Sequence, residues 1–500
     1  MDSIVVVSEE RAPLIDSYSQ RCDGARGGGA LEFDGEMLPE SQRCPPTPPA
    51  TSVVHPARLS QPNQRLASLD VFRGLTVAFM ILVDDAGGAF PAINHAPWFG
   101  VTIADFVMPS FLFSVGVSIA LVCRKATNKI VTTRKVLMRT IKLFFLGVLL
   151  QGGYFHGRNH WTYGVDIDRI RWLGVLQRIA IGYFLVAMSE IWLASNHPVH
   201  SPMSFMRKYY SQWVVVSLLS VIYIGLLLGL YVPNWEFEVS SSNSTLSMSN
   251  FGHQIETVYC GLRGNLSPPC NAVGFIDRLL LGEKHLYQNP VYKRTKDCSI
   301  NSPDYGPLPP NSPGWCLAPF DPEGILSSVM ATVTCFAGLQ FGHVIVHIKS
   351  HLKRVLIWSV SSVMLVLFAY FVAILGMPLS KPLYTLSYMF LTAGGSAIAL
   401  SLIYYLVDVK HIRKPTLLFQ WMGMNALIVY VLAACELFPI ALQGFYWKKP
   451  SNNLVNLSES FLQTILHSKK WGTLAFVFVE ILFWCLASGF LDMKGIYFKL

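Results

Sequence analysis

The stretch DFVMPSFLFSVGVSIALV, residues 105–122, carries one charged residue at its start and none in the 17 positions that follow. A helix needs about 20 mostly apolar residues, with a range of about 17–25, to cross the hydrocarbon core of a bilayer. Nine further windows of similar character occur at residues 66–90, 136–154, 173–194, 213–232, 325–346, 355–375, 384–407, 417–442 and 473–490. The sequence therefore predicts an all-α, polytopic transmembrane bundle of about ten spans.

The composition of the chain agrees with a membrane protein. Of its 500 residues, 52% are hydrophobic and 14% are charged, whereas soluble domains are about 25% charged. Residues 1–64 differ, because they hold a triple glycine, a proline-rich run and scattered charges but no apolar stretch long enough for a signal peptide. We expect a flexible cytosolic tail over residues 1–64 and one transmembrane domain over residues 65–500.

Lysine and arginine in the short loops predict the orientation of the bundle. With a cytosolic N-terminus, the inner loops would carry Arg124, Lys125, Lys129, Arg134, Lys135, Arg207, Lys208, Lys349, Lys353, Arg354, Lys410, Arg413 and Lys414. The first outer loop has none of these residue types, and the loop after the seventh window has only Lys381. This asymmetry follows the positive-inside rule, so both termini are expected in the cytosol. The net charge of +9 then reflects topology and gives no support for nucleic-acid binding.

A long connection over residues 233–320 falls on the outer side in this topology. It contains N-glycosylation sequons at Asn243 and Asn265, and a third lies at Asn456 in the last outer loop. Sequons are modified only on the luminal or extracellular side. The same connection holds four of the ten cysteines, namely Cys260, Cys270, Cys298 and Cys316. An oxidising compartment would allow two disulfides there, and all three pairings stay open.

Polar residues around the outer end of the first window mark a candidate site. Asp84 and Asp85 lie near that end, and ionisable groups at membrane depth by default mark a pathway or a site. His95 follows in a short loop, directly after Asn94. A histidine beside carboxylates can act as a proton acceptor or an acyl carrier, because its neutral form is available near neutral pH. A polar cap at the membrane surface is the alternative interpretation of His95.

The second and fourth windows add one acidic and one basic residue, Asp105 and Arg178, to the candidate site. Thr102 and Asp105 have the spacing of a helix N-terminal cap, which gives Asp105 a structural explanation. Arg178 lies inside the fourth window, where a guanidinium must find a carboxylate or a phosphate. Asp84, Asp85 and Asp105 are its predicted partners.

Later windows hold polar residues whose role is less defined. Residues 321–324, Asp-Pro-Glu-Gly, predict mainly the start of a helix. In the ninth window, Gly423 allows close backbone approach and Asn425 needs a partner, either through packing or through substrate contact. Glu436 is a further buried candidate without an assigned role.

Five motifs together carry a resemblance to a known family. They are RLASLDVFRG from residue 65, HAPWFGVTIAD from residue 95, GVLQR from residue 174, DPEG from residue 321 and GMN from residue 423. The chain resembles the heparan-α-glucosaminide N-acetyltransferase family from residue 65 to its end. This resemblance implies transfer of an acetyl group from cytosolic acetyl-CoA to an amino sugar across the membrane, with His95 as the catalytic residue. Supporting or substrate-binding residues are then expected at Asp84, Asp85, Asn94, Asp105, Arg178 and Asn425.

Two positions depart from the family pattern. The animal enzymes resembling this chain have Asn where this chain has Asp84, which puts a potential charge beside the reaction centre. The motif after the histidine usually reads Trp-Asn-Gly, whereas this chain has Phe99 in place of the Asn. The large luminal domain that precedes the first shared span in the animal enzymes has no counterpart in residues 1–64. These departures bear on the acceptor more than on the type of reaction.

The predicted mechanism brings acetyl-CoA from the basic inner side and an amino-sugar or glycan acceptor from the outer side. His95 would either take the acetyl group covalently or deprotonate the acceptor amine in a ternary complex. No metal is predicted. Two rival hypotheses are a transporter or channel that retains the bundle, and an acyltransferase acting on a hydroxyl. Membrane lipid is the expected environment, and a homo-oligomer is compatible with the sequence.

The N-terminal tail holds one indication of location. Residues 10–15, Glu-Arg-Ala-Pro-Leu-Ile, fit an acidic dileucine sorting signal. The predicted topology places this segment in the cytosol, where sorting adaptors could bind it. The sequence therefore favours a lysosomal or vacuolar membrane over the plasma membrane or the secretory pathway.

Overall fold

The computed structural model describes residues 66–497 apart from 124–127, 152, 158–159, 196–198, 200, 240–253, 319–321, 435–442, 444 and 450–451. The predicted tail over residues 1–64, the sequon at Asn243, Asp321 and Glu436 lie outside the described residues.

Seven helices in the described part of the chain are long and apolar enough to cross a membrane. They are Ile103–Cys123 (the 3₁₀ turn η1, Ile103–Phe106, with α2, Val107–Cys123), Val175–Leu193 (α4), Tyr210–Gly229 (α6), Ile325–His347 (α8), His351–Ile374 (α9), Leu386–Val409 (α10, Leu386–Tyr404, with the π-helical turn η7, Tyr405–Val409) and Lys469–Met493 (α15). Each coincides with one of the predicted windows. The predicted class, an all-α polytopic membrane protein, is confirmed.

The other three predicted windows are helical at least in part. Helices α1 (Ala67–Ala86) and α3 (Lys129–Leu149) contain several charged residues, which sets them apart from the seven apolar helices. The ninth window is divided into α11 (Leu417–Met424), α12 (Ala426–Val429) and the π-helical turn η8 (Tyr430–Ala434). The count of ten spans and the orientation of the termini stay predictions.

Close helix packing fixes the centre of the bundle. A Cβ atom on Gly116 of α2 would lie 2.0 Å from the carbonyl oxygen of Cys335 on α8, and one on Gly338 would lie 2.1 Å from that of Phe113. Only glycine permits this approach, because any side chain would enter the backbone of the neighbouring helix. Gly423 of α11 makes the predicted close approach in the same way, against the carbonyl of Asp70 on α1.

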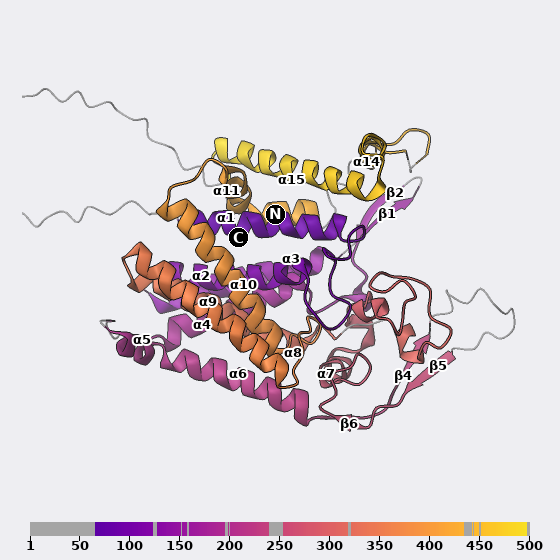
Figure 1. The fold of residues 1–500 in the computed structure, drawn as a ribbon, viewed down its shortest axis with the longest axis horizontal. Helices are drawn as coiled ribbons and strands as arrows, with labels where there is room; N and C mark the ends of the chain where they lie inside the picture. Colours follow the sequence, from indigo (N-terminus) through magenta and orange to yellow (C-terminus); the bar gives the residue numbers. More distant parts are fainter. Residues whose placement is uncertain are drawn as a thin grey trace, which may run out of the picture. The chain divides into compact units, whose positions relative to one another are not determined.

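A small folded region covers one end of the helices, as Figure 1 shows. Its strands pair antiparallel: β3 (Tyr231–Val232) with β6 (Leu262–Arg263), and β4 (Trp235–Val239) with β5 (Gln254–Val258). It continues with α7 (Ala272–Leu281) and the 3₁₀ turns η4 (Glu283–His285), η5 (Val291–Arg294) and η6 (Gly314–Leu317). Disulfides join Cys260 to Cys270 and Cys298 to Cys316. The connection predicted as a loop is thus a folded unit, and its four cysteines pair as sequence neighbours.

The remaining elements are short. They are the hairpin β1 (Gly153–Gly157) with β2 (His160–Gly164), the turn η2 (Ile167–Arg169), α5 (Pro202–Lys208) and α14 (Leu454–Ile465). Asn265 is half-buried beside β6, whereas Asn456 is exposed on α14, so the last sequon lies on a helix and not in an irregular loop.

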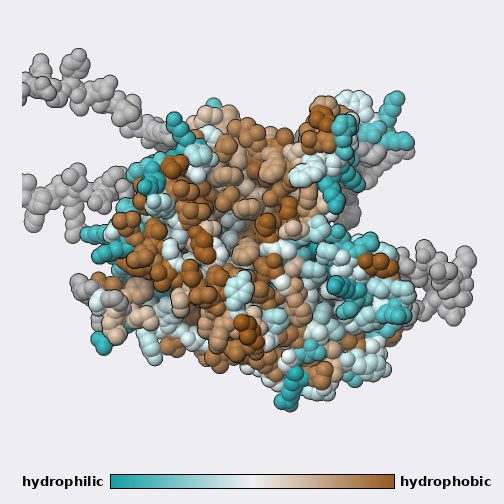
Figure 2. Space-filling view, in the orientation of Figure 1, coloured by the Kyte–Doolittle hydropathy of each residue, from teal (hydrophilic) through white to brown (hydrophobic). Residues whose placement is uncertain are grey.

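The surface agrees with burial of the bundle in lipid. Figure 2 shows apolar residues over the long helices and hydrophilic residues mainly toward the two ends. Many large apolar side chains of α6, α9 and α15 are exposed. A contiguous exposed apolar surface of this kind marks membrane contact.

Candidate active site

His95 lies in the loop that joins α1 to η1. The side-chain Oδ1 of Asn94 accepts a hydrogen bond of 2.8 Å from the backbone N–H of His95, which fixes the backbone locally. The His95 side chain is 29% exposed. It is therefore held in a defined position but stays reachable from a cavity.

Asp105 orients the imidazole of His95. This carboxylate is fully buried, and its Oδ1 lies 2.7 Å from Nδ1 of His95. Its Oδ2 accepts hydrogen bonds from the backbone N–H groups of Thr102 at 3.0 Å and Ala96 at 3.2 Å. The predicted capping role of Asp105 is confirmed, and the same carboxylate has a second task that the spacing did not indicate. Tyr388 adds a hydrogen bond of 2.5 Å from its hydroxyl to the Asp105 carbonyl.

Lys381 and Asp105 together set which nitrogen of His95 carries the proton. Its Nζ lies 3.1 Å from Nε2 of His95. An ammonium group can only donate, so Nε2 must accept and Nδ1 must carry the hydrogen toward Asp105. The pKa of His95 is lowered from the usual 6.5, first by burial and then by the charge of Lys381, against the opposing effect of Asp105. His95 is thus a neutral imidazole with its lone pair on Nε2.

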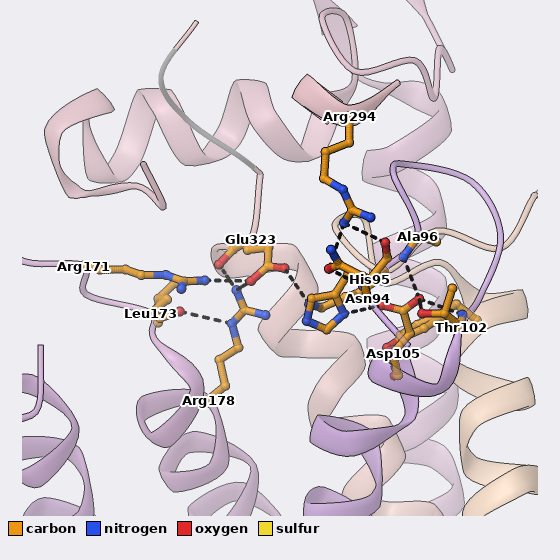
Figure 3. Close-up of polar contacts among 12 residues, drawn as sticks. Asn94, His95, Ala96, Thr102, Asp105, Arg171, Leu173, Arg178, Arg294 and Glu323 are labelled. Carbon is orange, nitrogen blue, oxygen red and sulfur yellow. Dashed lines mark hydrogen bonds and ion pairs between the residues drawn. The ribbon is translucent and has the colours of Figure 1, made fainter. Parts of the chain in front are cut away.

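Glu323 forms the anionic centre of a neighbouring cluster of cations. Its Oε2 accepts from Arg171 at 2.7 Å and from Arg178 at 3.1 Å, and its Oε1 lies 3.8 Å from Nζ of Lys381. Arg178 also donates to the backbone carbonyls of Leu173 and Glu323. The three cations hold the pKa of Glu323 well below its usual range, despite burial. Figure 3 shows this cluster beside His95, with Asp105 on the other side of the imidazole.

The predicted partners of Arg178 were wrong. Asp105 is engaged with His95 and the loop backbone, and the carboxylate that Arg178 contacts is Glu323, 145 positions further along the chain. A partner so distant in sequence is set by the packing of α4 against α8, which local spacing does not report.

The prediction that residues 321–324 act mainly as a helix start also needs correction. Helix α8 begins at Ile325, and the carboxylate of Asp277 in α7 accepts the Ile325 N–H at 2.8 Å. A Cβ atom on Gly324 would lie 2.2 Å from that carboxylate, so glycine lets Asp277 reach the helix end. Burial raises the pKa of Asp277 to about 6. Because Asp277 caps the helix, Glu323 is available to bind the arginines.

A cavity of about 150 Å³ joins His95 to its charged neighbours. Its lining includes Asp84, His95, Asp105, Glu323 and Lys381, with apolar side chains from α1, α2 and η8. The cavity therefore offers one neutral base, a cation and apolar walls within one small space.

Four predicted site residues, Asp85, Asn94, Arg178 and Asn425, do not line this cavity. Asn94 and Arg178 contact residues that do, namely His95 and Glu323. Asp85 instead lines a groove beside α14 and α15. Asn425 is buried, and its side-chain amide contacts the backbone carbonyl of Ile496 at 3.5 Å. This contact fits the packing interpretation of Asn425, and its role in the site stays a prediction.

Arg294 is a site residue that the sequence analysis missed. It comes from η5 and is 1% exposed. Its guanidinium donates to Oδ1 of Asn94 at 3.0 Å and to the carbonyl of His95 at 2.8 Å. The disulfide from Cys298 to Cys316 closes the chain just after this turn. The folded end region thus holds the His95 loop from above, as seen in Figure 3.

Comparison with known proteins agrees with this assembly. Residues 65–229 match the family model described as heparan-alpha-glucosaminide N-acetyltransferase, catalytic. Heparan-alpha-glucosaminide N-acetyltransferase of Homo sapiens is 29% identical over 470 residues, which cover 88% of this chain and 63% of the relative. The protein of that name from Mus musculus is 28% identical over 466 residues, covering 87% of this chain and 63% of the relative. The chain thus spans less than two thirds of the length of these relatives.

The matched region supplies His95 and Asp105, which line the cavity, and Arg171 and Arg178, which bind Glu323 beside it. The resemblance that the motifs predicted is confirmed: this chain is similar over most of its length to heparan-α-glucosaminide N-acetyltransferases, and its first spans correspond to their catalytic region.

Proposed function

We propose that the chain is a membrane-embedded acetyltransferase, which transfers an acetyl group from acetyl-CoA to the amine of an amino-sugar-like acceptor at His95. The observation that carries this proposal is the orientation of His95: Nδ1 faces Asp105 at 2.7 Å, so the Nε2 lone pair lies on the cavity side, where it accepts a hydrogen bond from Lys381 at 3.1 Å. The printed names of the relatives, which denote acetyl transfer to the nitrogen of a glucosaminide, support the same reaction.

The proposed reaction exchanges a thioester for an amide. The acceptor amine attacks the thioester carbonyl, and its proton passes to Nε2 of His95. The C–S bond then breaks, and the leaving thiolate takes that proton as the free thiol. For this step the amine replaces the ammonium of Lys381, which lies 3.1 Å from Nε2, and the ammonium turns to the carbonyl oxygen, where negative charge would develop.

The same orientation of His95 also serves a covalent route, in which Nε2 attacks the thioester and carries the acetyl group to the amine. The two routes differ in one measurement. Exchange of labelled coenzyme A into acetyl-CoA without acceptor requires an acetyl-enzyme, whereas direct transfer gives no exchange until the acceptor is present.

The donor is proposed to bind from the cytosolic side and the acceptor from the other side. The lysine and arginine distribution supports this arrangement, as do the two disulfides in the folded end region, since disulfides persist in oxidising compartments. The dileucine-like segment at residues 10–15 supports a lysosomal or vacuolar membrane.

The test of the proposal is release of coenzyme A thiol by the purified protein in sealed liposomes. Acetyl-CoA is supplied on one side, and amino sugars or their hydroxyl analogues are supplied on either side. Thiol release that requires an amino sugar supports the proposal. Release with hydroxyl analogues alone would favour an alcohol acyltransferase, and acceptor movement without thiol release would favour a transporter.

Replacement Asp105→Asn is expected to lower kcat/KM by about 100-fold or more, because an amide no longer fixes the hydrogen of His95 on Nδ1. The wrong tautomer would put the hydrogen on Nε2, facing Lys381. The Asn carbonyl can still accept from Thr102, so the folded protein should persist. Asp166→Asn, which alters an exposed cap on η2, is the control and should keep full activity. Equal activity of the two variants would contradict the role given to Asp105.

The pH dependence of kcat/KM should report the lowered pKa of His95. The neutral imidazole is the active form, so activity is retained below pH 6.5 and is lost only when His95 becomes protonated at a lower pH. Lys381→Gln removes a neighbouring positive charge, which raises the pKa of His95. The inflection measured with the same acceptor should therefore move to higher pH in the variant. A shift to lower pH would contradict the assignment.

Replacement Arg294→Lys tests the support of the His95 loop. Lysine keeps the charge but loses the planar guanidinium, in which Nε donates to the Pro303 carbonyl while Nη1 donates to both Asn94 and the His95 carbonyl. We expect kcat to fall roughly tenfold with little change in KM, since hydrogen bonds of a charged group are worth about 1.5–3 kcal/mol. Arg263→Lys on the exposed strand β6 is the matched control. A purely structural role would change stability and leave kcat of the folded fraction unaltered.

A further inference from the structure

Helix α14 (Leu454–Ile465) crosses the end of α15 and does not continue its direction; Figure 1 shows it end-on near the right-hand end of α15. Four large apolar side chains of α14 are exposed: Leu454 (45%), Leu457 (59%), Phe461 (64%) and Ile465 (54%). Their spacing of three, four and four residues puts them on one face of the helix. The helix therefore presents an uncovered apolar stripe.

The opposite side of α14 is polar and partly fixed to α15. Glu459 accepts from Thr473 of α15 at 2.8 Å and from Gln463 at 2.9 Å. Asn456 is exposed and lies about 145° around the helix from the centre of the apolar stripe. The helix is amphipathic, with a polar side that contacts α15 through Glu459 and an exposed apolar stripe.

Both ends of α14 have the residues typical of a membrane surface. Before the helix, Phe445 (73%), Tyr446 (52%) and Trp447 (68%) are exposed and are followed by Lys448 and Lys449. After it come Lys469, Lys470 and Trp471, the last 59% exposed. Aromatic rings and lysines gather where hydrocarbon meets head groups, since both combine an apolar body with a polar tip.

The stripe is continuous with the lipid-facing side of α15. Leu457 and Phe461 of α14 line a groove of about 1050 Å³ together with Phe476, Val479 and Phe483 of α15. The lining also includes polar residues, among them Asp85, Asn456, Glu459 and Glu480. Val479 and Phe483 belong to a helix long and apolar enough to span the membrane, and both are exposed on it. Figure 2 shows apolar surface where α14 lies. The apolar surroundings of α15 are therefore continuous with the groove and with the stripe on α14.

We propose that α14 is an interfacial helix, whose apolar stripe enters the lipid leaflet on the His95 side of the membrane and whose groove with α15 holds lipid acyl chains. The partner is a phospholipid surface, because the stripe joins the lipid-facing surface of α15 and is bounded at both ends by lysines and aromatic residues. This inference does not depend on acetyl transfer.

The helix would also set the depth of the active site. The rings of Phe90 and Trp471 contact each other edge to face, with centroids 5.7 Å apart. Phe90 precedes His95 by five positions in the same loop. An anchor at the start of α15 thus places the His95 loop near the level of the lipid head groups.

Photocrosslinking of the full-length protein tests this proposal. The photoreactive residue p-benzoylphenylalanine replaces Leu457, Phe461 or, as the control on the polar side of the same helix, Ser460. The protein is irradiated in nanodiscs of phosphatidylcholine and phosphatidylglycerol and analysed by mass spectrometry. Leu454, on the same stripe, is the substitute position should one replacement prevent folding.

Phospholipid adducts at Leu457 and Phe461, about fivefold or more above those at Ser460, are the expected result for a helix with one face in the leaflet. Crosslinks between two copies of the chain at the stripe would overturn the proposal and identify the stripe as a dimer interface. Equal lipid adducts on both faces, or none at any position of a monodisperse protein, would overturn it as well.

Discussion

His95→Gln is expected to abolish acetyl transfer, with kcat/KM reduced by about 1,000-fold or more. Glutamine has similar reach and can hydrogen-bond to Asp105, but it offers no basic lone pair to take the proton of the amine. Positioned proton transfer alone contributes about 100- to 10,000-fold, and the covalent route is lost in the same variant. Thiol release from acetyl-CoA in liposomes, with and without the amino-sugar acceptor, measures the loss.

The matched control for this variant is His285→Gln. His285 is another histidine near the same end of the molecule, and it contacts the carbonyl of Ile170 at 2.8 Å. The His285→Gln variant should retain most of the wild-type acetyl-transfer activity. If His95→Gln bound acetyl-CoA and still released thiol at the normal rate, His95 would have no catalytic role and the proposed function would need another base.

Glu323→Gln is expected to cause the largest loss of stability among the site variants. The replacement keeps the size of the side chain and removes the one carboxylate that contacts Arg171, Arg178 and Lys381. Breaking a buried ion pair by removing one partner costs about 3–5 kcal/mol, because an uncompensated charge is left behind. Thermal unfolding of the purified protein should show a clear drop in midpoint, and kcat should fall because Lys381 loses its anchor.

A second replacement distinguishes charge from packing in this cluster. Glu323→Gln combined with Lys381→Met removes one of the three uncompensated cations, so it should recover part of the lost midpoint. Glu238→Gln, on the exposed side of β4, is the control and should leave the midpoint almost unchanged. No difference between Glu323→Gln and Glu238→Gln would show that the cluster adds little to stability.

The sequence predicted the helices well where hydrophobicity alone decides them. The long apolar windows became α2, α4, α6, α8, α9, α10 and α15, since a span is defined by length and composition within one segment. The ninth window was harder, because Asn425 and the π-helical turn η8 divide it in ways that average hydropathy does not register.

In the active site, contacts between residues close in sequence could be predicted, whereas contacts between residues far apart in sequence could not. His95 and Asp105 are ten positions apart and share one loop and helix start, so their motif pointed to both. Glu323 lies in the DPEG motif, and Lys381 is the one basic residue of its loop. The local sequence around each gives no indication of which residues it contacts. Arg294 reaches Asn94 across 200 positions and had no local signal.

The order in which the site's residues appear along the chain affects its biogenesis. His95 and Lys381 are separated by 286 positions, so at a synthesis rate of about 5–20 residues per second the ribosome adds Lys381 roughly 15 to 60 s after His95. Arg294 and Glu323 are also made after residue 229, where the match to the catalytic region ends. A chain released early would contain the His95 loop but would lack Arg294, Lys381 and Glu323, which contact that loop or its neighbours in the folded protein. Under the proposed function, the nascent protein is expected to be inert toward acetyl-CoA until the later helices have been inserted.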